Sequence, residues 1–303
     1  MAKCIVFGGS GFIGRHLVNK LITAGHEVTI FLRPNTDKYD VPSGVNVVFG
    51  DFLNAHDLNA AVKGQKYVFH LVSLTNPAVS EEDPFIDIET NVKMTIHLLQ
   101  ACVENNVKRI IYTSSGGAIY GDPVTSPISE DDAANPISPY AIGKQTIEGY
   151  LRYFDKKFGL DYLCLRISNV YGEGQNTSNN KHGVIAVFLG KVIKDEPITV
   201  LGDGSAMRDY IEVHDLTNLI VKIFSQKCKY STYNIGSGSS ISVNEIIASI
   251  ERLLGKTAKK TYVNAPASYV NNIALDCTHA KDEFGNYAST PLFEGIRKMY
   301  SEA

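Results

Sequence analysis

A glycine-rich turn near the start of the chain constrains the fold more than any other stretch. The apolar run Lys3–Phe7 predicts a buried strand, and Gly8, Gly11 and Gly14 follow it as a helical pattern begins. Glycines at this spacing allow a tight turn, let backbone N–H groups approach a pyrophosphate and let the helix pack closely against the strand. The positive N-terminal end of the helix then faces the phosphates. The stretch predicts a dinucleotide-binding turn, although plain strand-to-helix turns also carry glycines.

Strand and helix patterns alternate through the first half of the chain. Strands are expected at 3–7, 27–32, 45–49, 67–71 and 109–113, and helices at 12–24, 55–62, 84–105 and 137–158. This order predicts an α/β fold of Rossmann type, a doubly wound parallel sheet with helices on both faces. Ligands then belong at the carboxyl ends of the strands.

Two domains are expected. The nucleotide-binding domain covers 1–172 and is rejoined by about 211–236, because a helix at 215–225 returns to the sheet. A smaller C-terminal α/β domain at 173–303 then binds the substrate. Further helices are expected at 183–194, from Ser242 with Glu245 completing a capping box, and at 292–300.

Charge and cysteine usage exclude several classes of function. The net charge of −3 and the pI of about 6.2 give no basic field for nucleic acid. No apolar run reaches about 18 residues, so no membrane helix is expected. The five cysteines are scattered without a C-x-x-C pair, which argues against disulfides and against a metal site. The first strand begins at residue 3, leaving no room for a signal peptide. Together these features favour a cytoplasmic location.

Arg33 bears on the choice of cofactor. It follows the second strand, where dinucleotide-binding folds often place an acid on the adenosine ribose. A guanidinium can instead bind a 2′-phosphate through two hydrogen bonds, so we predict NADP. The alternative is NAD, with Arg33 a solvated loop charge. Asp51, just past the third strand, is expected to accept a hydrogen bond from the adenine amino group or to serve as a turn or N-cap residue. His70 is expected to be a core residue.

The catalytic candidates lie at the end of one strand and the start of one helix. Ser114 and Ser115 end the fifth strand, and Ser138 is a suitable N-cap. Tyr140 then lies in the first helical turn, with Lys144 four residues on and on the same face. A phenol has a pKa near 10, and a nearby ammonium together with the positive nicotinamide ring favours its ionised form. We therefore predict Tyr140 as the base and Lys144 as its partner on the nicotinamide ribose, with one serine orienting the reacting oxygen.

A second Tyr-x-x-x-Lys pair, Tyr153 and Lys157, lies 13 residues further along the same expected helix. At 1.5 Å per residue this is about 20 Å away. We interpret the second pair as structural.

The ordered combination of motifs resembles the extended short-chain dehydrogenases/reductases of the nucleotide-sugar epimerase/dehydratase branch. The matching segments span almost the whole chain: Gly8–Gly14, Asp51, His70, Asn91, Ser114–Gly121, Tyr140–Lys144, Arg166–Gly172, Leu201–Gly204, Arg208–Ile211 and Tyr233–Gly236. The resemblance implies a dinucleotide held by Gly8, Ser10, Gly11, Phe12, Ile13, Gly14, Arg33, Asp51, Phe52, Leu71, Tyr140 and Lys144. It also implies a nucleotide-sugar substrate contacted by Asn169 and Arg208, and a polar segment through His182 that folds over the sugar. A surface ion pair with a nearby aspartate is the alternative role for Arg208.

Two departures from the family pattern affect the site. Counting back from Tyr120-Gly121 without a gap puts the usual hydroxyl position on Gly116, so a shift of one residue makes Ser115 the preferred candidate over Ser114. The stretch Val263–Asn271 also lacks the arginine that family members often carry for the diphosphate.

Three functions remain. Gly116 and Gly117 stand where family 4,6-dehydratases carry an acid and a base, and glycine cannot move protons. That favours a 4-epimerase, ranked first on the Ser-Ser-Gly-Gly loop, or a 4-keto-reductase that consumes NADPH, to which Arg33 points. A cofactor-binding regulator without activity is the third, which the complete set of Tyr140, Lys144 and serines disfavours. A homodimer through helices 84–105 and 137–158 is expected, as in relatives.

Overall fold

The computed structural model describes residues 1–34, 41–122, 126–177, 183–265, 270 and 272–301. Contacts between these residues divide the chain into two compact units. The first unit comprises Met1–Ile119, Pro136–Arg166 and Thr217–Tyr233. The second comprises Tyr120–Asn135, Ile167–Leu216 and Asn234–Ala303. Both units are therefore assembled from segments that are distant in sequence.

The first unit is built on a parallel sheet, as the alternating patterns predict. Its strands and helices in chain order are β1 (Lys3–Phe7), α1 (Phe12–Thr23), β2 (Glu27–Leu32), β3 (Asn46–Phe49), α2 (Ala55–Val62), β4 (Tyr67–His70), α3 (Pro77–Glu82), α4 (Pro84–Asp87), a π-helix (Ile88–Val92), α5 (Lys93–Glu104), β5 (Arg109–Ser115), α6 (Pro139–Phe158) and β6 (Asp161–Ile167). The described strands form a seven-stranded sheet in the order β10-β6-β5-β4-β1-β2-β3, with β10 at Thr232–Ile235. Strands β1 to β5 pair in parallel. The order reverses between β1 and β4, and this switch point is where such sheets bind ligands.

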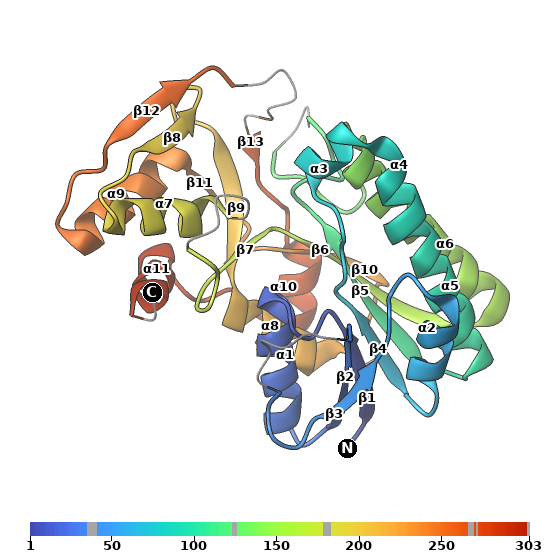
Figure 1. The fold of residues 1–303 in the computed structure, drawn as a ribbon. Helices are drawn as coiled ribbons and strands as arrows, with labels where there is room; N and C mark the ends of the chain where they lie inside the picture. Colours follow the sequence, from blue (N-terminus) through green and yellow to red (C-terminus); the bar gives the residue numbers. More distant parts are fainter. Residues whose placement is uncertain (35–40, 123–125, 178–182, 266–269, 271, 302–303) are drawn as a thin grey trace. The chain divides into compact units, whose positions relative to one another are not determined.

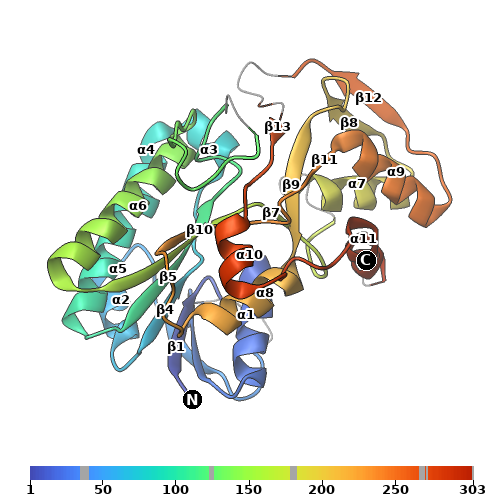
Figure 2. The same ribbon diagram turned by 180° about the vertical axis from the view of Figure 1, so that it is seen from behind.

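Helices cover both faces of this sheet (Figures 1 and 2). On one face α2, α5 and α6 pack side by side, and Leu58, Leu98 and Leu151 join Phe7 and Tyr112 in one apolar cluster. Helix α1 lies against the opposite face. Strands buried on both sides are nearly continuous apolar runs, which is why β1 is so plain in the sequence.

The expected helix at 84–105 is broken, and this part of the prediction is wrong. Helix α4 ends at Asp87, the π-helix follows, and α5 begins at Lys93. Pro84 opens α4, and the Asp83 carboxylate caps it by accepting a hydrogen bond from the Phe85 N–H. The π-helix widens the backbone locally, an arrangement often found at functional sites.

Helix α6 begins at Pro139 with Ser138 as its N-cap, as predicted, so the expected range of 137–158 starts two residues too early. The Ser138 side chain accepts a hydrogen bond from the Ala141 N–H at 3.3 Å, and Pro139 is the first helical residue. Gly159, in the left-handed region with φ of 71°, ends the helix. These signals fix the position of Tyr140 in the first turn.

The second unit is an α/β assembly around two small sheets. Its elements are β7 (Asn169–Tyr171), α7 (Val184–Ile193), β8 (Ile198–Leu201), β9 (Met207–Glu212), β11 (Ser240–Ser242), α9 (Val243–Leu254), β12 (Lys260–Val263), β13 (Asn272–Ile273), α10 (Thr278–Phe284) and α11 (Leu292–Tyr300). Helix α8 (Val213–Ile223) follows β9 directly and begins two residues earlier than expected, and its residues from Thr217 on belong to the first unit. Strand β9 pairs with β7, β11 and β13. The capping box of α9 between Ser242 and Glu245 is present as predicted.

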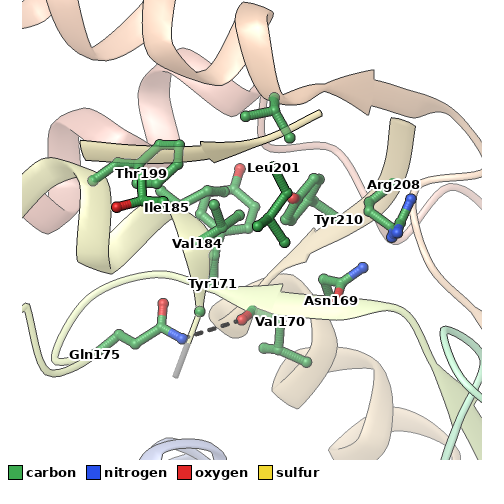
Figure 3. Close-up of a pocket in the computed structure, with 13 residues that line it drawn as sticks. Asn169, Val170, Tyr171, Gln175, Val184, Ile185, Thr199, Leu201, Arg208 and Tyr210 are labelled. Carbon is green, nitrogen blue, oxygen red and sulfur yellow. Dashed lines mark hydrogen bonds between the residues drawn. The ribbon is translucent and has the colours of Figure 1, made fainter. Parts of the chain in front are cut away.

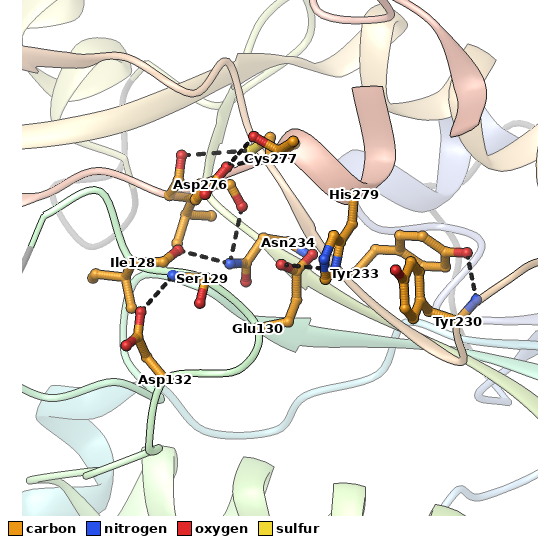
Figure 4. Close-up of polar contacts among 12 residues, drawn as sticks. Ile128, Ser129, Glu130, Asp132, Tyr230, Tyr233, Asn234, Asp276, Cys277 and His279 are labelled. Carbon is orange, nitrogen blue, oxygen red and sulfur yellow. Dashed lines mark hydrogen bonds and ion pairs between the residues drawn. The ribbon is translucent and has the colours of Figure 1, made fainter. Parts of the chain in front are cut away.

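Residues 120–135, between β5 and α6 in the chain, belong to the second unit. Asn234 holds this segment: its side-chain amide donates to the Ile128 carbonyl at 2.9 Å, and its N–H donates to Glu130 at 2.7 Å (Figure 4). The Ile128 N–H also donates to the Ala274 carbonyl at 2.9 Å. These bonds join positions about a hundred residues apart, so no local pattern announces them.

Candidate active site

The glycine turn has the geometry that the motif requires. Gly8 has a φ of +87°, and the Gly11 N–H donates to the Gly8 carbonyl at 3.0 Å. A methyl group at Gly14 would overlap that carbonyl oxygen, so only glycine lets α1 pack this closely on β1. No side chain caps the N-terminus of α1, which leaves its first N–H groups for an anion.

A cavity of about 360 Å³ opens beside this turn. It is lined by Gly8, Ser10, Gly11, Phe31, Leu32, Arg33, Phe52, Leu71, Val72 and Ser73. The structure thus brings together six of the predicted cofactor residues, Gly8, Ser10, Gly11, Arg33, Phe52 and Leu71. Phe12, Ile13 and Gly14 form the first turn of α1 next to the cavity. The residues present fit an adenine dinucleotide: a phosphate-binding turn, an apolar wall and one cation.

Asp51 is a predicted cofactor residue that does not line this cavity, and Phe12, Ile13, Gly14, Tyr140 and Lys144 do not line it either. One of its carboxylate oxygens accepts a hydrogen bond from the Leu53 N–H at 3.0 Å, as in a turn. Its own N–H donates to Asp57 at 2.9 Å. The neighbouring Phe52 lines the cavity in its place.

The two serines at the end of β5 have different partners. The Ser115 side chain lies close enough to the Tyr140 hydroxyl to lower its pKa. Ser114 is buried and donates to Glu148 at 2.7 Å, and Glu148 forms an ion pair with Arg166 at 2.8 Å. The hydroxyl beside the tyrosine is therefore that of Ser115, and Ser114 belongs to a buried polar network.

Lys144 is held close to Tyr140 by the same turn of α6. Its ammonium donates to the Thr113 carbonyl at 3.1 Å and lies 5.6 Å from the centroid of the Tyr140 ring. It also lies 4.9 Å from the Tyr112 ring. Burial lowers the pKa of Lys144 to about 8, while the Asp87 carboxylate opposes that shift.

The expected lowering of the Tyr140 pKa does not come from the groups of the chain. Burial raises the pKa of Tyr140 to about 12, and the nearby Ser115 side chain only partly offsets this effect. The Asp87 carboxylate raises the pKa further, because a negative charge disfavours a phenolate. The sequence prediction counted the lysine and missed both the burial and the acid.

His70 and the second tyrosine–lysine pair have the structural roles expected. His70 is buried, its Nε2 lies 2.8 Å from the Thr95 hydroxyl, and burial lowers its pKa to about 3. Tyr153 is 47% exposed and lies on the outer face of α6 with Lys157 5.7 Å from its ring centroid.

A second cavity, of about 440 Å³, lies in the second unit (Figure 3). It is lined by Asn169, Val170, Tyr171, Gln175, Gly183, Val184, Ile185, Phe188, Thr199, Leu201, Arg208, Tyr210 and Val243. Asn169 and Arg208, both predicted to bind substrate, thus share one pocket. Arg208 donates to the carbonyls of Met207 and Val270, and Asn169 donates to the Asp209 carbonyl at 2.9 Å. The predicted substrate residue His182 lies outside the described residues.

Sequence reasoning did not assign Thr199, Leu201 or Tyr210 to this pocket, whereas Gln175 lies in the polar segment through His182 that was expected to fold over the sugar. Leu201 and Tyr210 lie within segments that carried the family resemblance, which was the signal that could have found them. Thr199 lies inside the short strand β8. The sequence pattern of this strand indicates only that Thr199 is on one of its two faces, and it does not indicate a pocket.

No helix in the described ranges is long and apolar enough to cross a membrane. No group of three or more histidine, cysteine, aspartate or glutamate side chains gathers there in a metal-binding arrangement.

The fold and the first cavity define a Rossmann-type dinucleotide-binding protein with a tyrosine–lysine–serine site. Comparison with known families is more specific: residues 4–236 match the NAD-dependent epimerase/dehydratase family, and the chain belongs to this family.

Similar proteins include both epimerases and a reductase. A dTDP-4-dehydro-6-deoxyglucose reductase of Escherichia coli is 32% identical over 97% of this chain and 95% of its own length. The UDP-glucose 4-epimerase of Thermotoga maritima, solved with UDP-glucose, is 31% identical, with a TM-score of 0.92 over 99% of this chain and 97% of the other. The UDP-glucose 4-epimerase of Thermus thermophilus, solved with NAD, is 29% identical, with a TM-score of 0.90 over 99% and 98%.

Proposed function

We propose that this protein is a nucleotide-sugar 4-epimerase that acts on carbon 4 of a nucleotide-linked hexose. The observation that carries the proposal is the placement of Ser115 beside the Tyr140 side chain, with Lys144 on the same helical face as Tyr140. The similarity to UDP-glucose 4-epimerases over the whole chain supports it.

A nicotinamide dinucleotide bound there would supply a reversible hydride acceptor for carbon 4, and return of the hydride to the opposite face of that carbon would give the 4-epimer. The residues of this chain transfer the proton and position the reacting groups. Tyr140 takes the proton of the 4-hydroxyl group, and Ser115 holds the reacting oxygen in line. Lys144 holds the nicotinamide ribose and places a positive charge next to the tyrosine. Burial raises the pKa of Tyr140 to about 12. The positive charge of Lys144 must therefore counteract a large shift toward the neutral phenol.

The glycine turn and the first cavity are proposed to hold the dinucleotide. The first N–H groups of α1 bind the pyrophosphate, and Phe52 and Leu71 flank the adenine side of the cavity. Arg33 lines the cavity at the end of β2, where a guanidinium favours the 2′-phosphate of NADP. NAD, which the Thermus relative binds, is the alternative.

The second cavity is proposed to hold the nucleotide diphosphate of the substrate. Arg208 supplies a cation for the diphosphate, and Asn169 supplies an amide beside it. UDP is the nucleotide to test first, because the Thermotoga relative was solved with UDP-glucose.

A 4-keto-reductase is the second candidate, and two observations favour it. The E. coli dTDP-4-dehydro-6-deoxyglucose reductase is as similar to this chain as the epimerases are. Arg33 points to NADPH, the cofactor that a net reduction consumes. Dehydration stays disfavoured, because Gly116 and Gly117 offer no acid or base.

A homodimer through the helices of the first unit is proposed as well. Apolar side chains are exposed on α4, the π-helix and α6: Phe85 (71%), Ile88 (57%), Ile142 (50%) and Tyr153 (47%). Such residues on neighbouring helices suit packing against a second copy. Analytical ultracentrifugation tests this: a dimer is expected for the parent and a monomer for Ile142→Glu, whereas a monomeric parent contradicts the proposal.

The function is tested by incubating the protein with a panel of nucleotide hexoses and their 4-keto forms, and analysing the products by chromatography and mass spectrometry. An epimerase gives the 4-epimer with no net change in cofactor absorbance. Stoichiometric loss of reduced-cofactor absorbance with a 4-keto sugar identifies the reductase instead.

A further inference from the structure

A buried carboxylate that the proposed reaction does not use lies against the catalytic helix. Asp87 is the last residue of α4 and is 2% exposed. Its Oδ1 accepts hydrogen bonds from the Thr75 hydroxyl and from the Asn91 amide, the latter at 2.7 Å. Asn91 in turn accepts the Leu74 N–H at 2.9 Å. The carboxylate is thus fixed by the loop after β4 and by the π-helix.

The second oxygen of Asp87 faces α6 at Gly143. A methyl group built on Gly143 would overlap this oxygen, so a side chain of any size there would displace the acid. Gly143 lies directly before Lys144 and three residues after Tyr140. The carboxylate therefore meets the helix on the turn that carries both proposed catalytic residues.

The break in the helix expected at 84–105 explains why the Asp87 carboxylate lies against α6. Asp87 ends α4, and Asn91 lies four residues on, within the π-helix. Residues four apart share a helix face, so both side chains turn inward and meet. The π-helix adds the local widening that functional sites often show.

The two carboxylates near Lys144 differ in whether they are already paired with a cation. Asp87 of α4, Glu148 of α6 and Cys164 of β6 raise the pKa of Lys144. Lys144 in turn lowers the pKa of His70 of β4. The rings of Tyr112 and Tyr140 lie alongside its ammonium group. Glu148 already has a cation, since it forms an ion pair with Arg166 at 2.8 Å. The two side chains that donate to Asp87, Thr75 and Asn91, are uncharged.

We propose that Asp87 is a positioning residue that supplies the buried counter-charge for Lys144 and so keeps it an ammonium ion beside Tyr140. A buried lysine without a counter-charge releases its proton, and a neutral amine gives the phenolate no electrostatic support. The catalytic meaning of this role rests on the proposed function, whereas the charge relationship holds with or without turnover.

The Asp87 carboxylate also disfavours ionisation of the neighbouring Tyr140. The Asp87 charge raises the pKa of Tyr140 while it raises that of Lys144. Removing the charge should therefore move both groups toward lower pH, a signature that a purely structural side chain does not produce.

The direct test is a carbon NMR titration of the cofactor-free protein labelled at lysine Cε. The Lys144 signal is assigned by its loss in Lys144→Met. Asp87→Asn keeps the size of the side chain and removes its charge, so the Lys144 midpoint should fall by about half a pH unit or more. Glu89→Gln is the matched control: it removes an exposed acid two residues away and should leave the midpoint in place. An unchanged midpoint in Asp87→Asn overturns the proposal.

A second variant guards against a folding defect in Asp87→Asn. Gly143→Ala alone should be strongly destabilised, because the new methyl group meets the acid. In Asp87→Ala/Gly143→Ala the acid is gone, so the double variant should be more stable than Gly143→Ala and should show the same fall in midpoint. Equal stability of the two variants contradicts the geometry on which the proposal depends.

Turnover separates this inference from the function itself. If the parent converts a nucleotide sugar, the alkaline limb of kcat/KM should move to lower pH in Asp87→Asn, and an unmoved limb contradicts the positioning role. If the parent converts no nucleotide sugar, the proposed function fails, and the NMR titration still decides the charge relationship.

Discussion

The Ser115 side chain lies beside Tyr140 and lowers its pKa, while its neighbour Ser114 turns the other way and donates to Glu148. Successive residues of a strand point to opposite faces, so one serine of the pair meets the tyrosine and the other enters the interior. This relationship assigns separate roles to two hydroxyls that look equivalent in the sequence.

The two serines should respond differently to removal of the hydroxyl group. Ser115→Ala should lower kcat by about tenfold or more, because the reacting oxygen loses its hydrogen bond while the fold keeps all its contacts. Ser114→Ala should lower the free energy of unfolding by about 1–2 kcal/mol, because the buried Glu148 loses a donor. Steady-state kinetics and urea unfolding of both variants check this. A larger loss of kcat in Ser114→Ala would reverse the assignment.

Tyr140→Phe should lower kcat by about a hundredfold or more, since the ring is kept and the proton acceptor is lost. Tyr153→Phe is the matched control, because it alters the other Tyr-x-x-x-Lys pair on the exposed face of α6. It should retain the activity of the parent. Comparable activity in Tyr140→Phe and the parent would favour a protein that binds the cofactor without chemistry.

Arg208→Ala should raise the KM for the nucleotide sugar about tenfold or more and change kcat less, because a charged hydrogen bond to the diphosphate contributes to binding. Arg297→Ala, in an exposed ion pair with Glu294, is the control and should leave KM unchanged. Initial rates over a range of substrate concentrations give both constants. An unchanged KM in Arg208→Ala would remove the second cavity from the site.

Arg33→Ala should weaken binding of NADP about tenfold or more and leave binding of NAD nearly unchanged, because only NADP carries the 2′-phosphate. Calorimetric titration of each cofactor measures the two affinities. A parent that prefers NAD would show that Arg33 takes no part in recognising the cofactor.

The buried Lys144 should make stability depend on pH in a defined direction. Its pKa is lowered from 10.5 to about 8 in the folded chain, so between these values the unfolded chain binds the extra proton. The free energy of unfolding should therefore rise with pH from about 8 to about 10.5, by up to about 1.4 kcal/mol per pH unit. Urea unfolding at several pH values, with Lys144→Met as reference, checks this. A parent whose stability relative to Lys144→Met stays constant over that range contradicts the shift.

Local signals predicted much of this molecule. Ser138 was correctly predicted as the N-cap of α6, and the glycine spacing placed the dinucleotide turn, because caps and tight turns depend on neighbouring residues. The parallel sheet and its first five strands followed from the alternation of strands and helices, whereas β6 and β10 were not predicted.

What the sequence missed depends on contacts between distant positions. At the break after Asp87, the carboxylate accepts a hydrogen bond from Thr75, twelve residues earlier. The same carboxylate packs against Gly143, far along the chain, where a side chain would overlap it. The attachment of residues 120–135 depends on Asn234. The raised pKa of Tyr140 arises from burial, which spacing within one helix does not reveal.

The central claim is that Tyr140 and a bound nicotinamide act together on carbon 4 of a nucleotide-linked hexose. The most direct measurement follows UDP-glucose that carries deuterium at carbon 4, with NMR and mass spectrometry of the products. We predict that the parent forms the 4-epimer with the deuterium retained, and that Tyr140→Phe forms almost none. Formation of no 4-epimer from any nucleotide hexose, together with stoichiometric consumption of NADPH on a 4-keto sugar, would contradict the account.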